Sequence, residues 1–512
     1  MSFDVENMDR KQLIETISQL EKSASQVPIL EQKNNLLSQE NQYQKYIIEK
    51  FKRMLFGTKR ERFTKENPYQ MNLPFEEDQQ SEQKQDSEEK QTITYQREKP
   101  KKREKKGIEL PEDIEVEEIR IEPEEDVSNL KYIGEDVTKV LEFTPAKLKL
   151  KKYIRPKYAR ENHDDSTKGI VMGILPSRPI EKSMASSSLL SHLLVSKYVD
   201  HLPIYRQIEM FKRQRIKIPP STIDSWITQT ANLLSPLYDR LKQKILSQGY
   251  LQADETPIKV LDKNKKQKTH QGYYWVYHAP LQNAVFFDYR KSRDRYGPLA
   301  LLKNFKGYLQ SDGYSVYKLL EKQLPITLVG CMAHARRKFY DALAYDKEKA
   351  EYVLEKIQKL YAIESQAKQE QIYFEEIKEL RLDKALPIIN ELGKKLAEWN
   401  PKLLSKTPIG EAVSYAVNNW DYLQAYLNDG ALNIDNNLIE NAIRPNALGR
   451  KNYLFAGSHD AAQRAAMIYT FFGTCKMNNV NPYSWLKKVL DLIPEYSASK
   501  IEDLFPQNLK LD

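Results

Sequence analysis

Three carboxylates at widely separated positions carry the chemistry that this sequence could perform. Asp254 lies in the run GYLQADETPIKVL, Asp312 in GYLQSDGYSVY, and Glu440 in IDNNLIENAIRPNALGRK. Magnesium and manganese prefer oxygen ligands, and two such ions at a phosphodiester activate the attacking oxygen and neutralise the leaving one. We therefore predict that these three residues are catalytic, hold two Mg²⁺ or Mn²⁺ ions, and cut or join DNA.

Other acids compete for the same assignment, because the chain contains 71 Asp and Glu residues. Glu255 adjoins Asp254 on the opposite strand face, and Asp288 ends another strand. Asp254 and Asp312 are preferred because an independent strand pattern sets their positions. Glu440 is preferred for its polar and basic neighbours, which are Asn436, Asn437, Arg444, Arg450 and Lys451. The last three of these are predicted to contact DNA.

The elements that must position these acids follow from the hydrophobic pattern. Strands are expected at 251–261, 272–279, 283–289, 307–312 and 326–331, with a helix at 296–305. Three antiparallel strands followed by alternating helix and strand is the order of a ribonuclease-H-like α/β domain. Asp254 then lies in the first strand and Asp312 at the tip of the fourth. A helix entering at Asn436 or Asn437 would carry Glu440 in its first turn.

An N-terminal coiled coil is expected over residues 1–56. From residue 9 to 55, apolar positions alternate three and four apart, and the register slips at Pro28, which predicts two helical pieces with a kink. Asn34 and Asn41 weaken the seam. Two interpretations stay open, a helix folded back on its own protein and a homo-oligomer.

Two charged regions follow the coiled coil. Residues 57–107 are poor in apolar side chains and read as a flexible linker, whose basic end REKPKKREKK is a tether with some DNA affinity. Residues 108–165 are expected to form a small β module. Its basic strand KLKLKKYIRPKY could lie along a phosphate backbone or pair with the acidic block of the same module.

A helical DNA-binding region is expected over 166–247. The helix LPIYRQIEMFKRQ, the turn RIKIPP and the helix STIDSWITQTANLL have helix-turn-helix spacing. In that arrangement the second helix enters the major groove. The phosphates would be contacted by Lys212, Arg213, Arg215 and Lys217. An ordinary helical hairpin has the same pattern and is the alternative.

Composition sets the wider limits. The 512 residues are 40% hydrophobic and carry a net charge of +9, which allows several folded domains and favours a polyanionic partner. Two cysteines, no signal-like segment and no apolar run of about 20 residues indicate a cytoplasmic, nucleoid-associated protein without a membrane role.

The runs ADETP, SDGY, GCMAHARRKF and NNLIENAIRPNALGRKNYLFAGS resemble the transposases of the insertion-sequence-66 family, a group of DDE transposases. The resemblance places the catalytic acids at Asp254, Asp312 and Glu440, and a Cys-x-x-His signature of uncertain role at Cys331 and His334. It implies a catalytic domain at 248–452 with a helical insertion at about 340–430, a C-terminal helical region at 453–512, and accessory proteins from the same element.

The sequence departs from the family in one respect. Many relatives carry Cys-x-x-Cys pairs in the small β module, whereas no cysteine precedes Cys331 here and only His163 is nearby. A closed zinc site needs four ligands, so we expect no zinc. Cys331 and His334 are then expected to pack or to anchor a helix.

The leading hypothesis is a DDE transposase that cleaves the 3′ ends of its element and transfers them to target DNA. One alternative is a catalytically decayed transposase that still binds DNA and assembles. Another is a nuclease for RNA–DNA hybrids, which would need neither the coiled coil nor the basic tether.

Overall fold

The computed structural model describes residues 10–56, 176–262 and 269–511, with short pieces at 157–159 and 170–172 and the single positions 148, 150, 151 and 153. The predicted linker 57–107 and most of the predicted β module lie outside these residues. The chain divides into two compact units, one of residues 1–84 and 176–512 and one of residues 85–175. In the second unit, β1 (Lys157–Ala159) and β2 (Ile170–Met172) form an antiparallel pair.

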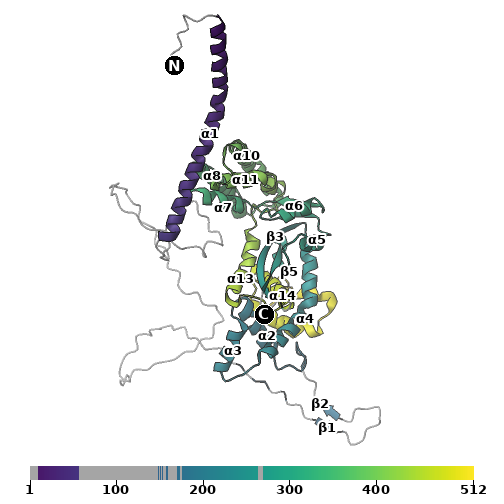
Figure 1. Cartoon of the computed structure of the whole chain (residues 1–512). Coiled ribbons are helices and arrows are strands. Elements are labelled where there is room, and N and C mark those ends of the chain that lie inside the picture. The colour runs from purple at the N-terminus through teal and green to yellow at the C-terminus, as the bar shows by residue number, and fades with distance from the viewer. Residues whose placement is uncertain are drawn as a thin grey trace, which may run out of the picture. The chain divides into compact units, whose positions relative to one another are not determined.

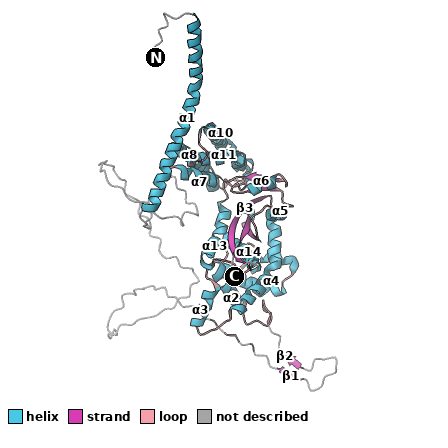
Figure 2. Cartoon of the chain, viewed as in Figure 1, coloured by secondary structure: helices cyan, strands magenta, loops and turns pink. Residues whose placement is uncertain are grey.

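One mixed five-stranded sheet lies at the centre of the first unit (Figure 2). Its strands are β3 (Tyr250–Leu261), β4 (Thr269–Ala279), β5 (Ala284–Arg290), β6 (Gly307–Gln310) and β7 (Ile326–Val329). The order across the sheet is β5-β4-β3-β6-β7. The first three strands pair antiparallel, and β6 and β7 continue the sheet in parallel. The five strands expected from the sequence are therefore present in a multidomain α/β protein.

Helices cover both faces of the sheet. Six consecutive residues are buried in β4 (274–279) and six in β5 (284–289), most of them aromatic or β-branched, as expected for strand segments without a solvent face. Phe286 packs against Tyr238 of α4 (Pro220–Leu246), with ring centroids 5.1 Å apart. The next residue, Phe287, packs against Tyr469 of α14 (His459–Met477) at 5.7 Å. Because neighbouring strand residues point to opposite faces, α4 and α14 lie on opposite faces.

The edge strand β5 is capped by side chains from α14. The hydroxyl of Thr470 accepts a hydrogen bond from the backbone N–H of Phe287 at 2.9 Å, and Thr474 accepts one from Val285 at 3.2 Å. Unpaired N–H groups on an edge strand can pair with other chains, and these two bonds occupy two such groups of β5. The C-terminal helical region therefore includes a helix that packs directly on the central sheet.

Shorter helices complete the sheet domain. They are α5 (Tyr296–Leu301), α6 (Ser315–Glu321), α13 (Asn437–Tyr453) and α15 (Pro482–Leu492). Among them α13 packs against β3 and β4. None of the helices in the described part of the chain has the length and apolar character that crossing a membrane requires.

A helical layer separates β7 from α13. Its helices are α7 (Met332–Ala342), α8 (Lys347–Glu370), α9 (Phe374–Leu380), α10 (Leu386–Trp399), α11 (Pro408–Asn418) and α12 (Trp420–Gln424). A π-helical turn, Arg381–Ala385, joins α9 to α10. There the buried Arg381 pairs with Glu364 at 2.7 Å and donates to the carbonyls of Tyr426 and Leu432. Those bonds hold the segment that contains Tyr426 and Leu432 against the helical layer.

The predicted helix pair precedes the sheet. It consists of α3 (Ile204–Arg213) and α4, and α2 (Ser187–Tyr198) lies before it. The second helix begins at Pro220, with Pro219 as N-cap, because proline suits the first turn. It also continues to Leu246, well beyond the expected end. The amide of Gln207 fastens α3 to α2 through the carbonyl of Leu193 at 3.3 Å.

The N-terminal helix α1 (Arg10–Phe56) is continuous, so the expected break into two pieces at Pro28 is wrong. Proline removes one backbone donor, and the turns on either side keep enough hydrogen bonds for the helix to continue. Figure 1 shows α1 beside the helical layer. There Gln39 donates to the carbonyl of Lys402 at 2.9 Å, and Tyr43 and Tyr46 contact the ring of Tyr345 edge-on.

The opposite side of α1 carries the predicted seam. At 100° per residue, Leu30, Leu37 and Ile48 lie about half a turn away from Gln39 and Tyr46. The three apolar side chains are between 50% and 55% exposed. The helix thus contacts its own protein with one side and presents the seam on the other, and oligomerisation through the seam stays a prediction.

Candidate active site

The pairing of β3 with β6 brings the first two predicted acids together. Gln252 lies opposite Gln310 in this parallel pair. Continued for two residues, the same register places Asp254 alongside Asp312, which follows the end of β6. Adjacent strands lie about 4.8 Å apart, and residues two positions apart share a sheet face. Asp254 and Asp312 therefore lie close together, and the charge of Asp312 raises the pKa of Asp254.

Glu440, on α13, lies near the two aspartates. The helix begins at Asn437, with Asn436 as N-cap, and Glu440 occupies its first turn, as predicted. The carboxylate of Asp435 accepts hydrogen bonds from the backbone N–H of Asn437 at 3.1 Å and from the hydroxyl of Tyr361 at 2.7 Å. A carboxylate at a helix N-terminus stabilises the first turn. Asp435 therefore fixes the start of α13 against α8.

The three acids interact through space. Burial raises the pKa of Asp254 well above its usual range, and the charges of Glu255, Asp312 and Glu440 raise it further. Burial, with the charges of Asp435 and Asp312, raises the pKa of Glu440 to about 7, against a smaller opposing effect of Arg337. Without a cation, these carboxyl groups therefore tend to keep their protons near neutral pH, and a bound cation would favour their ionised form.

The donor type fits a divalent metal, although the ligand set is incomplete. Carboxylate oxygens are the donors that Mg²⁺ and Mn²⁺ prefer. Within the residues that the structure describes, no group of three or more His, Cys, Asp or Glu side chains has the arrangement of a metal site. Substrate oxygens and water would therefore have to complete any coordination.

The two residues of the Cys-x-x-His signature lie at the start of α7. Cys331 is fully buried at the N-cap, and burial raises the pKa of its thiol. The next residue, Met332, donates its backbone N–H to the carbonyl of Ile434 at 3.1 Å. One turn into the helix, His334 places Nε2 3.5 Å from Oε1 of Glu440. The signature therefore lies beside the approach to α13, and its imidazole faces an acid of the site.

The two competing acids have basic partners of their own. Glu255 projects from the opposite face of β3, pairs with Arg293, and accepts a hydrogen bond from the hydroxyl of Tyr317 at 3.1 Å. Asp288 pairs with Arg290 at 2.6 Å. Both carboxylates are used in packing around the sheet, so neither competes for the position between β3, β6 and α13.

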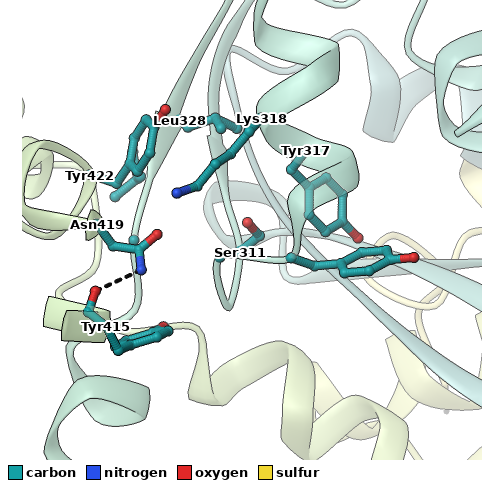
Figure 3. A pocket seen from close by; sticks show the side chains of 11 residues that line it. Ser311, Tyr317, Lys318, Leu328, Tyr415, Asn419 and Tyr422 are labelled. Carbon is teal, nitrogen blue, oxygen red and sulfur yellow. Dashed lines mark hydrogen bonds between the residues drawn. The ribbon is translucent and has the colours of Figure 1, made fainter. Parts of the chain in front are cut away.

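A pocket next to Asp312 joins the sheet domain to the helical layer (Figure 3). Figure 3 shows Lys318 extending toward Tyr422 and Asn419. The hydroxyl of Tyr415 donates to the backbone carbonyl of Asp312 at 2.7 Å. The residue after Asp312 is Gly313, whose φ of +89° suits glycine. The loop carrying Asp312 is thus held from the helical layer.

The sequence contains a signal for supporting residues in addition to the three predicted catalytic acids. The phrase GYLQ precedes both aspartates, as GYLQAD before Asp254 and GYLQSD before Asp312. In the structure both copies lie on adjacent parallel strands, and the Gln252 amide donates to the Gln310 side chain at 2.9 Å. The repeat therefore marks a buried pair as well as the acids. No comparable signal identifies Tyr415.

Comparison with known proteins decides the family. A family model described as Transposase IS66 family matches residues 182–464, which contain the three acids, the signature residues and the helical layer. The chain belongs to the IS66 family of transposases. A model of the IS66 C-terminal element matches residues 470–507, and one described as Transposase C of IS166 homeodomain matches residues 44–119.

Proteins similar to this IS66 transposase occur in Sinorhizobium fredii. The uncharacterized protein y4jD of that organism is 31% identical over 79% of this chain and 82% of its own length. The uncharacterized protein y4qI is 33% identical over 78% of this chain and 76% of its own length. No solved structure shows a significant match.

The basic residues predicted to contact DNA occupy two places in this family member. Lys212, Arg213, Arg215 and Lys217 are all exposed, at the end of α3 and in the turn before α4. Near the end of α13, Arg450 is half-buried and donates to Thr256 Oγ1 at 2.6 Å and to the carbonyl of Pro257. Arg450 thus fastens α13 to β3. Arg444 is half-buried on α13, and Lys451 is exposed.

Proposed function

We propose that this IS66 transposase is an active DDE enzyme that cleaves the 3′ ends of its element and joins them to target DNA. The observation that supports the proposal is that Asp254 and Asp312 follow the paired residues Gln252 and Gln310 at the same spacing, and that Asp312 and Glu440 both raise the pKa of Asp254. The sheet order of three antiparallel strands followed by two parallel ones supports a ribonuclease-H-like catalytic domain.

In this proposal the three acids hold two Mg²⁺ or Mn²⁺ ions. Such ions lower the pKa of an attacking water or 3′-hydroxyl and neutralise charge on the leaving oxygen. The protein's part is to keep the carboxylates at one place and to exchange their protons for metal. His334, 3.5 Å from Glu440, is placed to orient that carboxylate. Asp435 and Tyr361 keep the first turn of α13 in position.

Other parts of the molecule would bind DNA or assemble copies of the protein on it. The four exposed bases around the α3–α4 turn would contact phosphates while the start of α4 enters the major groove. The seam of α1 would join two or more copies, so that both element ends are held together. Accessory proteins of the same element are further expected partners.

The proposal is tested by replacing two acids of the same sheet, Asp254 and Asp288, and comparing DNA cleavage and joining. Purified protein is incubated with a duplex that contains an element end and with Mg²⁺ or Mn²⁺, and cleaved and joined strands are separated by electrophoresis. Asp254→Asn should reduce both products by at least about a thousandfold, since it removes a metal ligand. Asp288→Asn, the matched control, should stay within a few-fold of the natural protein.

Three results would contradict the proposal. Activity that survives Asp254→Asn would place the catalytic acid elsewhere. End binding without any metal-dependent product would indicate a decayed transposase that acts in DNA binding and assembly. Cleavage of RNA–DNA hybrids without preference for element ends would indicate a nuclease.

A further inference from the structure

Two glutamines, each two residues before a predicted catalytic aspartate, form a buried pair. Gln252 and Gln310 are both 0% exposed. The amide nitrogen of Gln252 donates to Oε1 of Gln310 at 2.9 Å, and the hydroxyl of Tyr250 donates to the same oxygen at 2.5 Å. The ring of His278 lies 3.0 Å from Oε1 of Gln252. Each of these polar groups thus has a partner inside the sheet domain.

The same two amides bond to the segment that leads into α13. Gln252 donates to the backbone carbonyl of Asp435 at 3.1 Å, and Gln310 donates to that of Asn433 at 2.7 Å. Gln310 also donates to the carbonyl of Gly330 at 3.1 Å. In return, the backbone N–H of Asn433 donates to the hydroxyl of Tyr250 at 3.2 Å. We call Tyr250, Gln252 and Gln310 the glutamine clamp.

The clamp fixes a segment that has no regular structure of its own. Residues 429–436 lie between the last turn of the helical layer and the start of α13, outside any helix or strand. Their backbone carbonyls therefore need partners from elsewhere, and a buried carbonyl without one is costly. Because Glu440 follows in the first turn of α13, the place where this segment is held sets the place of its carboxylate.

The clamp also lies in register with the acids. Gln252 precedes Asp254 by two residues on β3 and therefore shares its sheet face, and Gln310, its partner on β6, precedes Asp312 by two residues. Burying amide groups costs free energy unless each is hydrogen-bonded, whereas apolar side chains of similar size would pack there without any need for partners. Its geometry is directional, and it joins both aspartate strands to the Glu440 segment.

We propose that Gln252 and Gln310 are positioning residues that set Glu440 against the Asp254–Asp312 pair. The inference rests on the proposed function for its catalytic consequence, but the placement of residues 433–437 can be measured without any activity. Gln310→Met and Gln252→Met keep the side-chain size and remove the amides. Tyr250→Phe is the milder variant, and it tests the clamp if either methionine variant fails to fold.

The first measurement is amide hydrogen exchange in the full-length protein without metal or DNA. Exchange at residues 433–437 should become about tenfold faster or more in the clamp variants, while β3 and β6 stay protected. The matched control is Thr474→Val, which removes a buried hydroxyl that bonds to the backbone of β5, two strands away from β3. It should leave exchange at 433–437 unchanged. Unchanged exchange at 433–437 in all three clamp variants would overturn the proposal.

The second measurement follows cleavage of an element-end duplex as the Mg²⁺ concentration is varied. The clamp variants should bind the duplex like the natural protein, cleave it about tenfold more slowly or worse, and need more Mg²⁺ for half-maximal rate. Thr474→Val should keep the natural Mg²⁺ requirement. The positioning role would be rejected if the clamp variants exchange faster at residues 433–437 but cleave at the rate and with the Mg²⁺ requirement of the natural protein. If the natural protein cleaves nothing, the proposed function fails, and the exchange result still decides whether the clamp holds the segment.

Discussion

The hydroxyl of Tyr415 donates a hydrogen bond to the backbone carbonyl oxygen of Asp312, with 2.7 Å between the two oxygens. Tyr415 belongs to α11, so the helical layer inserted between the second aspartate and Glu440 reaches back to hold the loop of that aspartate. The layer therefore does more than separate two candidate catalytic residues in the sequence, because it contacts the loop of one and the approach to the other.

This contact predicts the behaviour of Tyr415→Phe. Loss of one buried hydrogen bond should lower the free energy of unfolding by about 1 kcal/mol and slow end cleavage several-fold, because the Asp312 loop gains freedom. Tyr352→Phe is the matched control, since the Tyr352 hydroxyl bonds to Glu391 on an exposed surface of the same layer. Chemical denaturation and single-turnover cleavage measure the two effects. Equal cleavage rates for both variants would contradict the prediction.

Gly313→Ala should disturb the same loop through the backbone. Gly313 has a φ of +89°, and an added Cβ would lie 3.2 Å from the side-chain oxygen of Asn419. We expect a loss of about 1–2 kcal/mol in unfolding free energy together with slower cleavage. Gly249→Ala provides the comparison, because nothing lies within 4 Å of its added Cβ. If urea denaturation finds the two variants equally stable, the backbone at Gly313 does not constrain the Asp312 loop.

The acid cluster predicts that the metal-free protein loses stability as pH rises. Burial and neighbouring negative charge raise the pKa of Glu440 to about 7 from an ordinary value of 4.5. Between these two pH values the folded state binds more protons than the unfolded state, so the free energy of unfolding falls with increasing pH. Glu440→Gln cannot ionise. It should be more stable than the natural protein by on the order of 2 kcal/mol at pH 8, and the difference should vanish near pH 4.5.

Denaturation with a chelator present, at pH 5 and at pH 8, measures this difference. Added Mn²⁺ should then stabilise the natural protein more than Glu440→Gln, because binding to the folded state adds to stability. A variant that is less stable than the natural protein at both pH values would show that the Glu440 carboxylate is favourably paired in the folded protein.

The bases around the α3–α4 turn predict a salt effect. Replacing Lys212, Arg213, Arg215 or Lys217 by Ala should weaken binding to specific and unrelated duplexes alike. For each phosphate that a variant no longer neutralises, the slope of log K against log salt should become shallower by about 0.9. Lys395→Ala on α10 is the control, because its exposed ammonium pairs with Glu398 in the helical layer. Titration by fluorescence anisotropy at several salt concentrations tests this, and an unchanged slope would assign the turn to a plain helical hairpin.

Local pattern was sufficient for most elements of the first unit. The buried aromatic run of β4 and the start of α13 at Asn437 could be read from neighbouring residues, because helix and strand periods and N-terminal polar residues act over a few positions. Pro28 shows where such reasoning is weak. A proline predicts a break, whereas α1 continues through it and contacts the helical layer with one side.

The sequence by itself determined the family, the strand that carries Asp254, the strand that precedes Asp312, and the helix that carries Glu440. Only the tertiary structure decided which acids are neighbours, that Arg450 fastens α13 to β3, and that the two glutamines hold the approach to Glu440. The physical reason is distance along the chain. The Gln252–Gln310 bond joins residues 58 positions apart, and the bond from Gln252 to Asp435 spans 183 positions. Register and loop path at such separations depend on the packing of the whole sheet domain, which no local pattern specifies.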